Sequence, residues 1–486
     1  MTSLKKDVFG LTFVNVYDFG LQFLVPMVVA RVLSPGDFGS YRMCWLVAMT
    51  VYSLAVLHIP HSLSYFLPRV GREDKIKYIV STLFLLSLLS VMAAAVVNPW
   101  FPLLPVKWIH VGQPDWYFPV FIGLWVMGGL NDYLAIGDGR VHWQIRAILF
   151  LATARSLLIS LTAWLTHDLS TVLLAMLAFV SIKALLPLIY MARFYRTAWL
   201  LDKTVLRQQF KYALPFGIAQ GFYDLRLQSE QWMVAAMFNV RQFAAFSLGG
   251  MMSPLFYMLR QSINNAVLPR LSALHAEHKI AELALLNKKA TTMIGFFVIP
   301  SACILWMYSK EVITVIYTAQ YLDAVDVMRV YMIGILPQVF ESHLLLRVCG
   351  FGGFGLKLHM FMLPLALTCS YTGIQLIGLP GGALGSVLTS LLSHLFSVMR
   401  VSRHLGAGFF ELYDIKRFFL YLFIAMVAIN ISVYVADYWV DEYLLSFWQI
   451  YNINISLARG ALGGGYAMLV FISICWLSKL IPSGFK

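Results

Sequence analysis

The sequence predicts an all-α polytopic membrane protein with about 14 transmembrane helices, and two observations support this fold class. Of the 486 residues, 60% are hydrophobic and only 12% are charged, whereas roughly a quarter of the residues of a typical soluble domain are charged. Apolar runs of about 20 residues, enough to cross a hydrocarbon core of about 30 Å as a helix, recur along the whole chain. Backbone polar groups inside a bilayer must bond within their own segment, so these runs are expected to be helices. No soluble domain is expected.

The expected spans follow one another closely along the chain. The first apolar run is too long for a signal peptide and ends without a small-residue cleavage site, so it is interpreted as an uncleaved span. The fourteen ranges are 8–32, 40–66, 76–98, 116–137, 143–166, 171–192, 211–237, 244–268, 290–308, 326–346, 357–378, 382–400, 417–436 and 459–480.

A short polar turn at residues 33–41 separates the first two spans. Pro35 cannot continue a helix and Gly36 tolerates positive φ, so the chain is expected to reverse direction here. A similar turn recurs at residues 238–246, between the seventh and eighth spans. Leu-Pro-Arg tripeptides at 67–69 and 268–270 are then each expected to open a charged inner loop.

These recurrences predict two related six-helix lobes. Because six spans return the chain to its starting side, the second lobe would enter the membrane in the same orientation, and the lobes would be related by an axis along the membrane normal. The expected domains are an N-terminal lobe at 1–205, a C-terminal lobe at 206–410, and two additional helices, spans 13 and 14, at 411–486.

The distribution of basic residues predicts the orientation. The net charge of +13 would suggest a nucleic-acid partner in a soluble protein, but here the Lys and Arg residues gather in alternate short connectors between spans. Cytoplasmic connectors carry such an excess. We therefore expect both termini in the cytoplasm, the lipid bilayer as a partner, and no nucleic acid.

Two helices carry polar residues at helical spacing. They are Asn15, Asp18 and Gln22 on the first span, and Gln220, Asp224 and Gln228 on the seventh. Each set lies on one face of its helix and is expected to face a cavity. The alternative is that these side chains form interhelical hydrogen bonds in a solid bundle.

Four basic residues lie well inside predicted spans: Arg155, Lys183, Arg226 and Arg260. Each costs about 2.5 to 3.5 kcal/mol at a helix centre on insertion scales, so each needs a partner or water. Guanidinium groups bind phosphate oxygens through two parallel hydrogen bonds and stay charged at low dielectric, which makes a diphosphate a natural ligand. Local ion pairs or snorkelling are the alternative. Glu230 lies one helical turn from Arg226 and is a potential partner.

Acidic residues inside spans are candidates for coupling to H⁺ or Na⁺. They are Asp18, Asp224 and Glu230. The alternative role for each is that of a salt-bridge partner. The five cysteines lie in or at the ends of apolar runs without a CxxC pair, so we expect reduced, packed thiols and neither a metal site nor a disulfide framework. No other cofactor is expected.

Two segments resemble a known family. Residues 29–41, with Ala30-Arg31, the Ser34-Pro35-Gly36 turn, Phe38-Gly39 and Tyr41, resemble the first hairpin of polysaccharide transporters. Residues 310–317 resemble the segment before span ten in the same group. This group comprises O-antigen (Wzx-like) flippases of the multidrug/oligosaccharidyl-lipid/polysaccharide (MOP) superfamily, whose two lobes enclose a cavity and alternate its access.

The resemblance implies a flippase and not an enzyme. Its substrate would be a polyprenyl-diphosphate-linked oligosaccharide of O-antigen or exopolysaccharide type, moved across the bacterial inner membrane. On this hypothesis Arg155 and Arg226 hold the diphosphate, with Lys183 and Arg260 as further cations, while Tyr223 and Trp232 contact sugar. Other polysaccharide-assembly proteins would be partners.

Three alternatives remain open at this point. A cation-coupled multidrug exporter of the same superfamily would have a more acidic, aromatic cavity and fewer buried arginines. A membrane-embedded polysaccharide polymerase or ligase would need a large outer loop or an interfacial acidic motif, whereas the connectors are short and no Asp-x-Asp occurs. A scaffold of an export complex is the third alternative.

Overall fold

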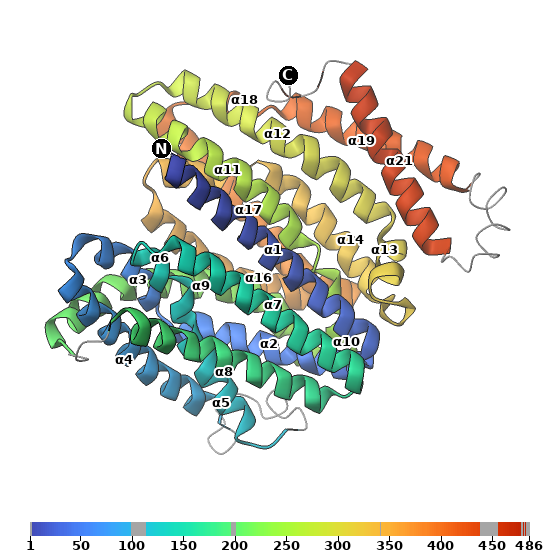
Figure 1. Ribbon diagram of the computed structural model, residues 1–486. Coiled ribbons are helices and arrows are strands. Elements are labelled where there is room, and N and C mark those ends of the chain that lie inside the picture. The colour runs from blue at the N-terminus through green and yellow to red at the C-terminus, as the bar shows by residue number, and fades with distance from the viewer. Residues whose placement is uncertain are drawn as a thin grey trace. The chain divides into compact units, whose positions relative to one another are not determined.

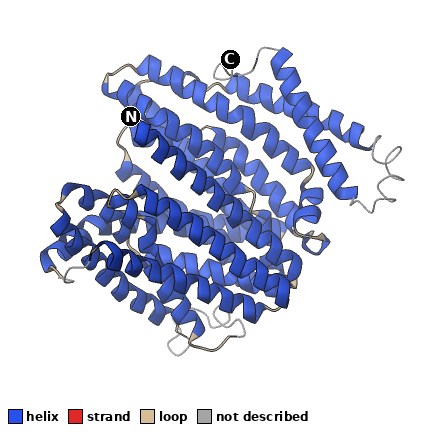
Figure 2. Cartoon of the chain, viewed as in Figure 1, coloured by secondary structure: helices blue, strands red, loops and turns tan. Residues whose placement is uncertain are grey.

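The computed structural model describes residues 2–98, 113–195, 201–340, 342–437, 455–477, 480 and 482. The secondary-structure elements of these residues are helices, and none of the described ranges contains a strand (Figure 2). The chain divides into two compact units, Met1–Gln228 and Ser229–Lys486. The division falls inside a long helix, later in the chain than the lobe boundary predicted after residue 205. The three predicted domains stay a prediction.

The described part of the first unit is built from helices (Figure 1). In chain order these are α1 (Thr2–Val32), α2 (Pro35–Ala55), α3 (Ile59–Phe66), α4 (Arg72–Val96), α5 (Tyr117–Gly128), α6 (Leu134–Gly137), α7 (Val141–Thr166), α8 (Leu169–Phe194) and the first part of α9 (Lys203–Met237), with short 3₁₀ segments η1 (Leu67–Arg69) and η3 (Gly129–Asp132). The helix α1 packs along α7, and α7 and α8 pack side by side.

The second unit continues from the end of α9. Its helices are α10 (Val240–Gly249), α11 (Ser253–Ala276), α12 (Ile280–Met307), α13 (Ser309–Ile316), α14 (Ala324–Ile335), α15 (Ser342–Val348), α16 (Gly352–Ile377), α17 (Leu384–Leu405), α18 (Phe409–Leu412), α19 (Ile415–Asp437) and α21 (Ile455–Leu477), with 3₁₀ segments η4 (Ala319–Tyr321), η5 (Leu336–Val339) and η6 (Leu379–Ala383). The C-terminal pair α19 and α21 pack against each other and against α12.

The two turns predicted from the sequence have the same construction. Ser34 caps α2 by accepting a hydrogen bond from the Asp37 N–H at 3.2 Å, with Pro35 at the first helical position. Asn239 caps α10 in the same way, accepting from the Gln242 N–H at 2.9 Å, and the Gln242 side chain completes a capping box. Each side-chain oxygen satisfies a donor that the helix itself leaves unpaired. Both turns are therefore confirmed, whereas the symmetry between the lobes stays a prediction.

The two Leu-Pro-Arg tripeptides differ. Residues 67–69 form the 3₁₀ segment η1, which leads into the connector before α4, as predicted. The prediction for 268–270 is wrong, because Pro269 lies inside α11 and the helix continues to Ala276. Proline is tolerated inside membrane helices where neighbouring groups satisfy the freed carbonyl. The connector in this region begins only after Ala276.

Nine helical segments in the described part of the chain are long and apolar enough to cross a membrane, or ten if the bent pair Pro35–Ala55 and Ile59–Arg69 is one span. Each coincides with one of the predicted ranges. The predicted ranges that do not meet this test are 211–237, 244–268, 326–346 and 459–480. The range 244–268 is interrupted between α10 and α11, and 326–346 is interrupted by η5. The number fourteen stays a prediction.

The outside of the molecule is apolar in a way that suits lipid. Large hydrophobic side chains are exposed along the helices, among them Phe9 at 73%, Leu376 at 81% and Phe423 at 67%. A soluble monomer seldom exposes apolar patches of this kind, whereas lipid covers them without cost. The chain is a multi-pass membrane protein.

Small residues bring α16 and α17 into close contact. A Cβ atom added at Gly385 would overlap the Ser370 hydroxyl, and one added at Gly381 would overlap the Gly373 carbonyl group. The Ser370 hydroxyl donates to the Gly382 carbonyl at 2.8 Å across the same contact. Helix backbones approach this closely only where side chains are absent. The sequence motif Gly381-x-x-x-Gly385 thus makes a helix–helix contact.

Candidate functional site

The predicted cation Arg155 and the predicted coupling residue Asp18 form an ion pair. Arg155 of α7 donates to the Asp18 carboxylate of α1 at 2.8 Å. The second oxygen of Asp18 accepts from the Gln22 side-chain amide, also at 2.8 Å. The two side chains are 16% and 28% exposed. This pair is therefore only partly buried.

The polar face of α9 has a similar internal bond. The Gln220 amide donates to the Asp224 carboxylate at 3.0 Å, one helical turn away. Farther along the helix, Gln228 hydrogen-bonds the Thr50 hydroxyl of α2. Both predicted polar stripes therefore belong to the first unit. In each stripe, a glutamine amide bonds to a carboxylate of the same helix. In addition, Asp18 bonds to Arg155 of α7, and Gln228 bonds to Thr50 of α2.

Lys183 has local partners on α5 and η3. Its ammonium group lies 3.7 Å from the Asp132 carboxylate and 4.4 Å from the centre of the Trp125 ring. The Lys183 main-chain carbonyl accepts a hydrogen bond from the Asn131 side chain. Only 11% of the side chain is exposed. These contacts favour a structural ion pair for Lys183, and its role in binding substrate stays a prediction.

Arg226 and Glu230 are buried on α9, at 4% and 5% exposure. The Arg226 guanidinium carbon lies 5.7 Å from the centre of the Tyr223 ring. The Glu230 carboxylate accepts a hydrogen bond at 2.6 Å from the hydroxyl of Tyr331 on α14. Tyr223 and Trp232 are half-buried, and their predicted contacts with sugar stay predictions.

Arg260 of α11 contacts the 3₁₀ segment η5, which interrupts the predicted span 326–346. Its guanidinium group donates to the main-chain carbonyl of Gln338 at 3.1 Å and to the side-chain oxygen of the same residue at 3.0 Å. Gln338 belongs to η5, the segment between α14 and α15. An arginine at such a break satisfies carbonyl groups that the interrupted helix leaves unpaired. Arg155, Lys183 and Arg260 thus have different described partners: Asp18, Asp132 and Gln338.

A buried carboxylate that the sequence interpretation did not single out lies at Asp138, in the turn between α6 and α7. It accepts from Lys75 at 2.8 Å, Arg140 at 2.9 Å, Tyr195 at 2.8 Å and the Tyr190 hydroxyl. The Asp138 side chain is 3% exposed. Burial alone would raise the pKa of Asp138, but the hydrogen bonds from Lys75 and the two tyrosines outweigh it and lower the pKa below its ordinary value.

The Asp138 network joins three predicted inner connectors. Lys75 starts α4, Arg140 precedes α7, and Tyr195 follows α8. These connectors therefore lie at one end of the first unit, as alternate connectors of a membrane bundle must. The signal in the sequence was a Gly137-Asp138-Gly139-Arg140 turn, whose glycines indicated only a flexible connector.

The helical arrangement is that of known membrane transporters. It matches a structure of the lipid II flippase MurJ in an inward closed conformation with a TM-score of 0.73 and 13% identity, covering 96% of this chain and 99% of that one. An inward-facing multidrug resistance MATE family transporter of the MOP superfamily matches with a TM-score of 0.66 and 13% identity, covering 79% and 94%. A MOP superfamily transporter from Pyrococcus furiosus matches with a TM-score of 0.57 and 14% identity, covering 83% and 96%. The chain has the fold of MOP-superfamily transporters.

Two family models give the more particular assignment. Residues 4–137 match one model described as polysaccharide biosynthesis protein, and residues 144–326 match a second model with the same description. The comparison with curated proteins finds no match. Over these two ranges the chain matches polysaccharide biosynthesis proteins, and its fold is that of MOP-superfamily transporters. The resemblance of the first hairpin is thereby confirmed.

Proposed function

We propose that this protein is a flippase that moves a polyprenyl-diphosphate-linked oligosaccharide from the cytoplasmic to the outer leaflet of a bacterial inner membrane by alternating access. The two family matches support a role in polysaccharide biosynthesis, and the fold supports transport without a catalytic step. Such a substrate has a charged head that must cross hydrocarbon while its lipid tail stays in the bilayer. The protein must therefore offer a polar path with cations along it.

The observation that carries the proposal is the pair of Arg155 and Asp18. A guanidinium group in a membrane-length helix has a partner that a substrate can replace, because both side chains are partly exposed. A diphosphate presents several oxygens to the planar fork of arginine and carries more charge than a carboxylate. The diphosphate would therefore compete with Asp18 for Arg155.

This competition links the substrate to the state of Asp18. When the diphosphate holds Arg155, Asp18 loses its cation and keeps only the neutral Gln22 amide. When the substrate leaves on the other side, Asp18 pairs with Arg155 again, and this step resets the site. An H⁺ or Na⁺ ion that drives this cycle has to move inward as the substrate moves outward, and Asp18 is the residue proposed to couple the two movements.

The test separates binding from transport. In purified protein, binding of a polyprenyl diphosphate is measured against that of the corresponding monophosphate; in vesicles, translocation of a fluorescent polyprenyl-diphosphate oligosaccharide is followed by its loss of access to an impermeant reductant. Arg155→Ala should weaken diphosphate binding by tenfold or more, which corresponds to about 1.4 kcal/mol. Arg155→Lys should recover only part of it, because the bidentate fork is lost.

Asp18→Asn gives the sharper result. Without its competing carboxylate, Arg155 should bind diphosphate more tightly than in the wild type, while transport should fall because the reset step is missing. The matched control is Asp74→Asn, which removes a carboxylate from the exposed pair of Asp74 and Lys77 in the same unit. This variant should bind and transport as the wild type does.

Three results would contradict the proposal. Equal binding of diphosphate by wild type and Arg155→Ala would remove the arginine from the site. Unchanged transport in Asp18→Asn would remove the coupling step. Binding and export of a cationic dye, with no preference for the diphosphate, would instead support the multidrug exporter.

A further inference from the structure

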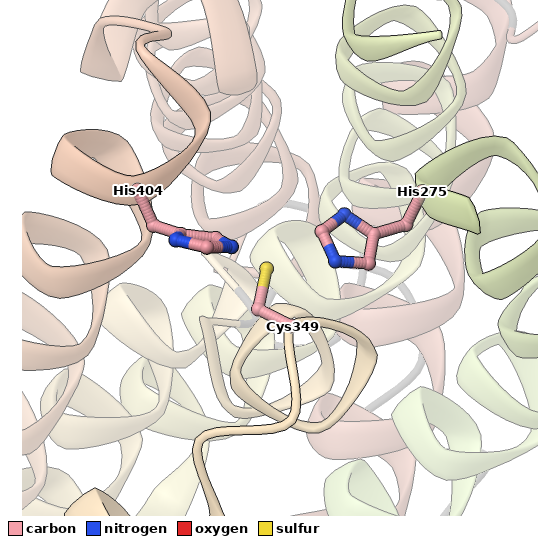
Figure 3. A group of neighbouring side chains, drawn as sticks. All are labelled: His275, Cys349 and His404. Carbon is pink, nitrogen blue, oxygen red and sulfur yellow. The ribbon is translucent and has the colours of Figure 1, made fainter. Parts of the chain in front are cut away.

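Three side chains with metal-binding atoms meet in the second unit. His275 comes from the last turn of α11, Cys349 directly follows α15, and His404 lies in the last turn of α17. One ligand atom of each residue lies within 4.8 Å of the others. Figure 3 shows the Cys349 sulfur between the two imidazole rings.

The local backbone holds these residues at the ends of their helices. The Cys349 N–H donates to the Leu345 carbonyl at 2.9 Å, and Gly350 then adopts a left-handed conformation with φ 75°. Gly406, with φ 64°, ends α17 in the same way, two residues after His404. Left-handed residues of this kind close helix C-termini, and glycine adopts them without strain. The three ligands therefore come from rigid elements.

Packing also orients the rings. The His404 ring meets the Phe351 ring edge-on, with 4.9 Å between centroids, and its centroid lies 5.8 Å from that of His275. The Nδ1 atom of His275 is buried and has no hydrogen-bond partner among the described residues. The packing of the three helices thus keeps both rings beside the Cys349 sulfur.

The ligand set indicates which ion would bind. Hard cations such as Mg²⁺ and Ca²⁺ prefer oxygen ligands, and this group offers none. Imidazole and thiolate together suit Zn²⁺, whose bonds are about 2.0 to 2.1 Å to nitrogen and about 2.3 Å to sulfur. Tetrahedral coordination at these lengths brings ligand atoms to roughly 3.3 to 3.7 Å from one another, so small side-chain rotations from the present spacing complete the site. The thiolate also offsets part of the positive charge of the ion.

We propose that His275, Cys349 and His404 bind one Zn²⁺ ion, with water as the fourth ligand, and that the ion ties together the ends of α11, α15 and α17. This proposal is independent of the proposed flippase activity. The sequence predicts that all five cysteines are packed thiols. For Cys349 we propose instead that the thiol is a metal ligand. The ion would hold three helix ends of the second unit in one arrangement.

The test uses the full-length protein, purified with a tag free of histidine and freed of metal by a chelator. Titration of Zn²⁺ against a chromophoric chelator should give one tightly bound ion per chain. Substitution by Co²⁺ should produce the charge-transfer absorption of a Co²⁺–thiolate bond. Zn²⁺ should raise the temperature of thermal unfolding, because it binds the folded protein.

Matched variants make the result specific. Cys349→Ser should abolish the charge-transfer band and weaken Zn²⁺ binding by about tenfold or more, and His404→Gln should weaken binding similarly. The controls are Cys369→Ser, a half-buried cysteine of the same unit, and His278→Gln, three residues after His275 and exposed. Both controls should bind as the wild type does.

The proposal fails if the wild type binds no ion stoichiometrically. It also fails if Cys349→Ser and His404→Gln keep wild-type affinity, or if Cys369→Ser loses affinity equally. Should Cys349→Ser unfold when purified, His404→Gln and His275→Gln decide the question, since both keep the thiol and remove a nitrogen ligand.

Discussion

Two carboxylates of the first unit, Asp18 and Asp138, differ in how completely their oxygens are used. Asp138 is 3% exposed and accepts from four donors, two of them cationic. Asp18 is 28% exposed and accepts from one cation and one amide. Both would be described as membrane-protein acids with a basic partner.

The difference separates a structural carboxylate from one that can exchange its partner. A carboxylate has about four lone-pair positions. At Asp138 they are all occupied and shielded, so a substrate or proton gains nothing there. Asp18 accepts from fewer donors and is more exposed. On the proposed function, this difference in the saturation of the oxygens marks Asp18 as the acid that exchanges its partner.

The largest effect on stability is expected for Asp138→Ala. This change leaves Lys75 and Arg140 without their common partner, and removing one member of a buried pair costs about 3 to 5 kcal/mol. The lower end is expected, because Lys75 and Arg140 are 20% and 34% exposed and regain some water. Thermal unfolding in detergent and the amount of protein in the membrane measure the loss. If Asp138→Ala were nearly as stable as the wild type, Asp138 would not be more important for stability than Asp18.

A smaller loss is expected for Tyr190→Phe. The ring keeps its edge-on contact with Trp143, at 5.5 Å between centroids, and only the hydrogen bond to Asp138 is lost. A hydrogen bond to a charged group contributes about 1.5 to 3 kcal/mol. Tyr195→Phe removes a parallel bond, and the double variant should not be additive, because both act on one carboxylate. If the double variant lowered the unfolding temperature by the sum of the two single effects, Tyr190 and Tyr195 would act independently of each other.

Asp18→Asn should change stability least among these substitutions. Partly exposed ion pairs contribute about 0 to 1 kcal/mol, and the Asn side chain keeps a hydrogen bond with Gln22 or Arg155. Thermal unfolding should therefore stay near that of the wild type, although transport falls. A loss as large as that of Asp138→Ala would assign Asp18 the same structural role.

Mild acid should leave the contribution of Asp138 unchanged. Its pKa in the folded protein is below the ordinary 3.8, so its stabilisation is present above that value and is lost only as the pH falls through the lower folded pKa. The difference in unfolding temperature between wild type and Asp138→Asn should be the same at pH 7, 6 and 5. If the difference shrank in this range, the carboxylate would be protonating well above its ordinary pKa.

Much of the fold could be predicted from the sequence, because the length of an apolar run and the residues of a turn are local properties. The hairpins at Ser34 and Asn239 are of this kind. Pro254 and Pro337 predict kinks in their spans, and they lie beside the break between α10 and α11 and inside η5. At Pro269 the sequence predicted the end of a helix, but α11 continues to Ala276. A proline inside a helix is tolerated where neighbouring helices pack against it.

The candidate site was predicted as residues but not as pairs. Asp18 and Arg155 were both singled out, yet 137 residues separate them, and no local pattern indicates that α1 packs along α7. Asp138 was missed because a Gly-Asp-Gly turn in isolation indicates flexibility. His275, Cys349 and His404 lack the short spacing by which metal ligands are recognised in a sequence.

The glycine contact between α16 and α17 bears on how the second unit moves. Side chains that interdigitate loosely allow helices to slide, but two backbones in direct contact have no intermediate position to adopt. The α16–α17 hairpin should thus travel as one stiff rod whenever the protein changes state. Any hinge in this part of the chain has to lie outside the hairpin of residues 352–405.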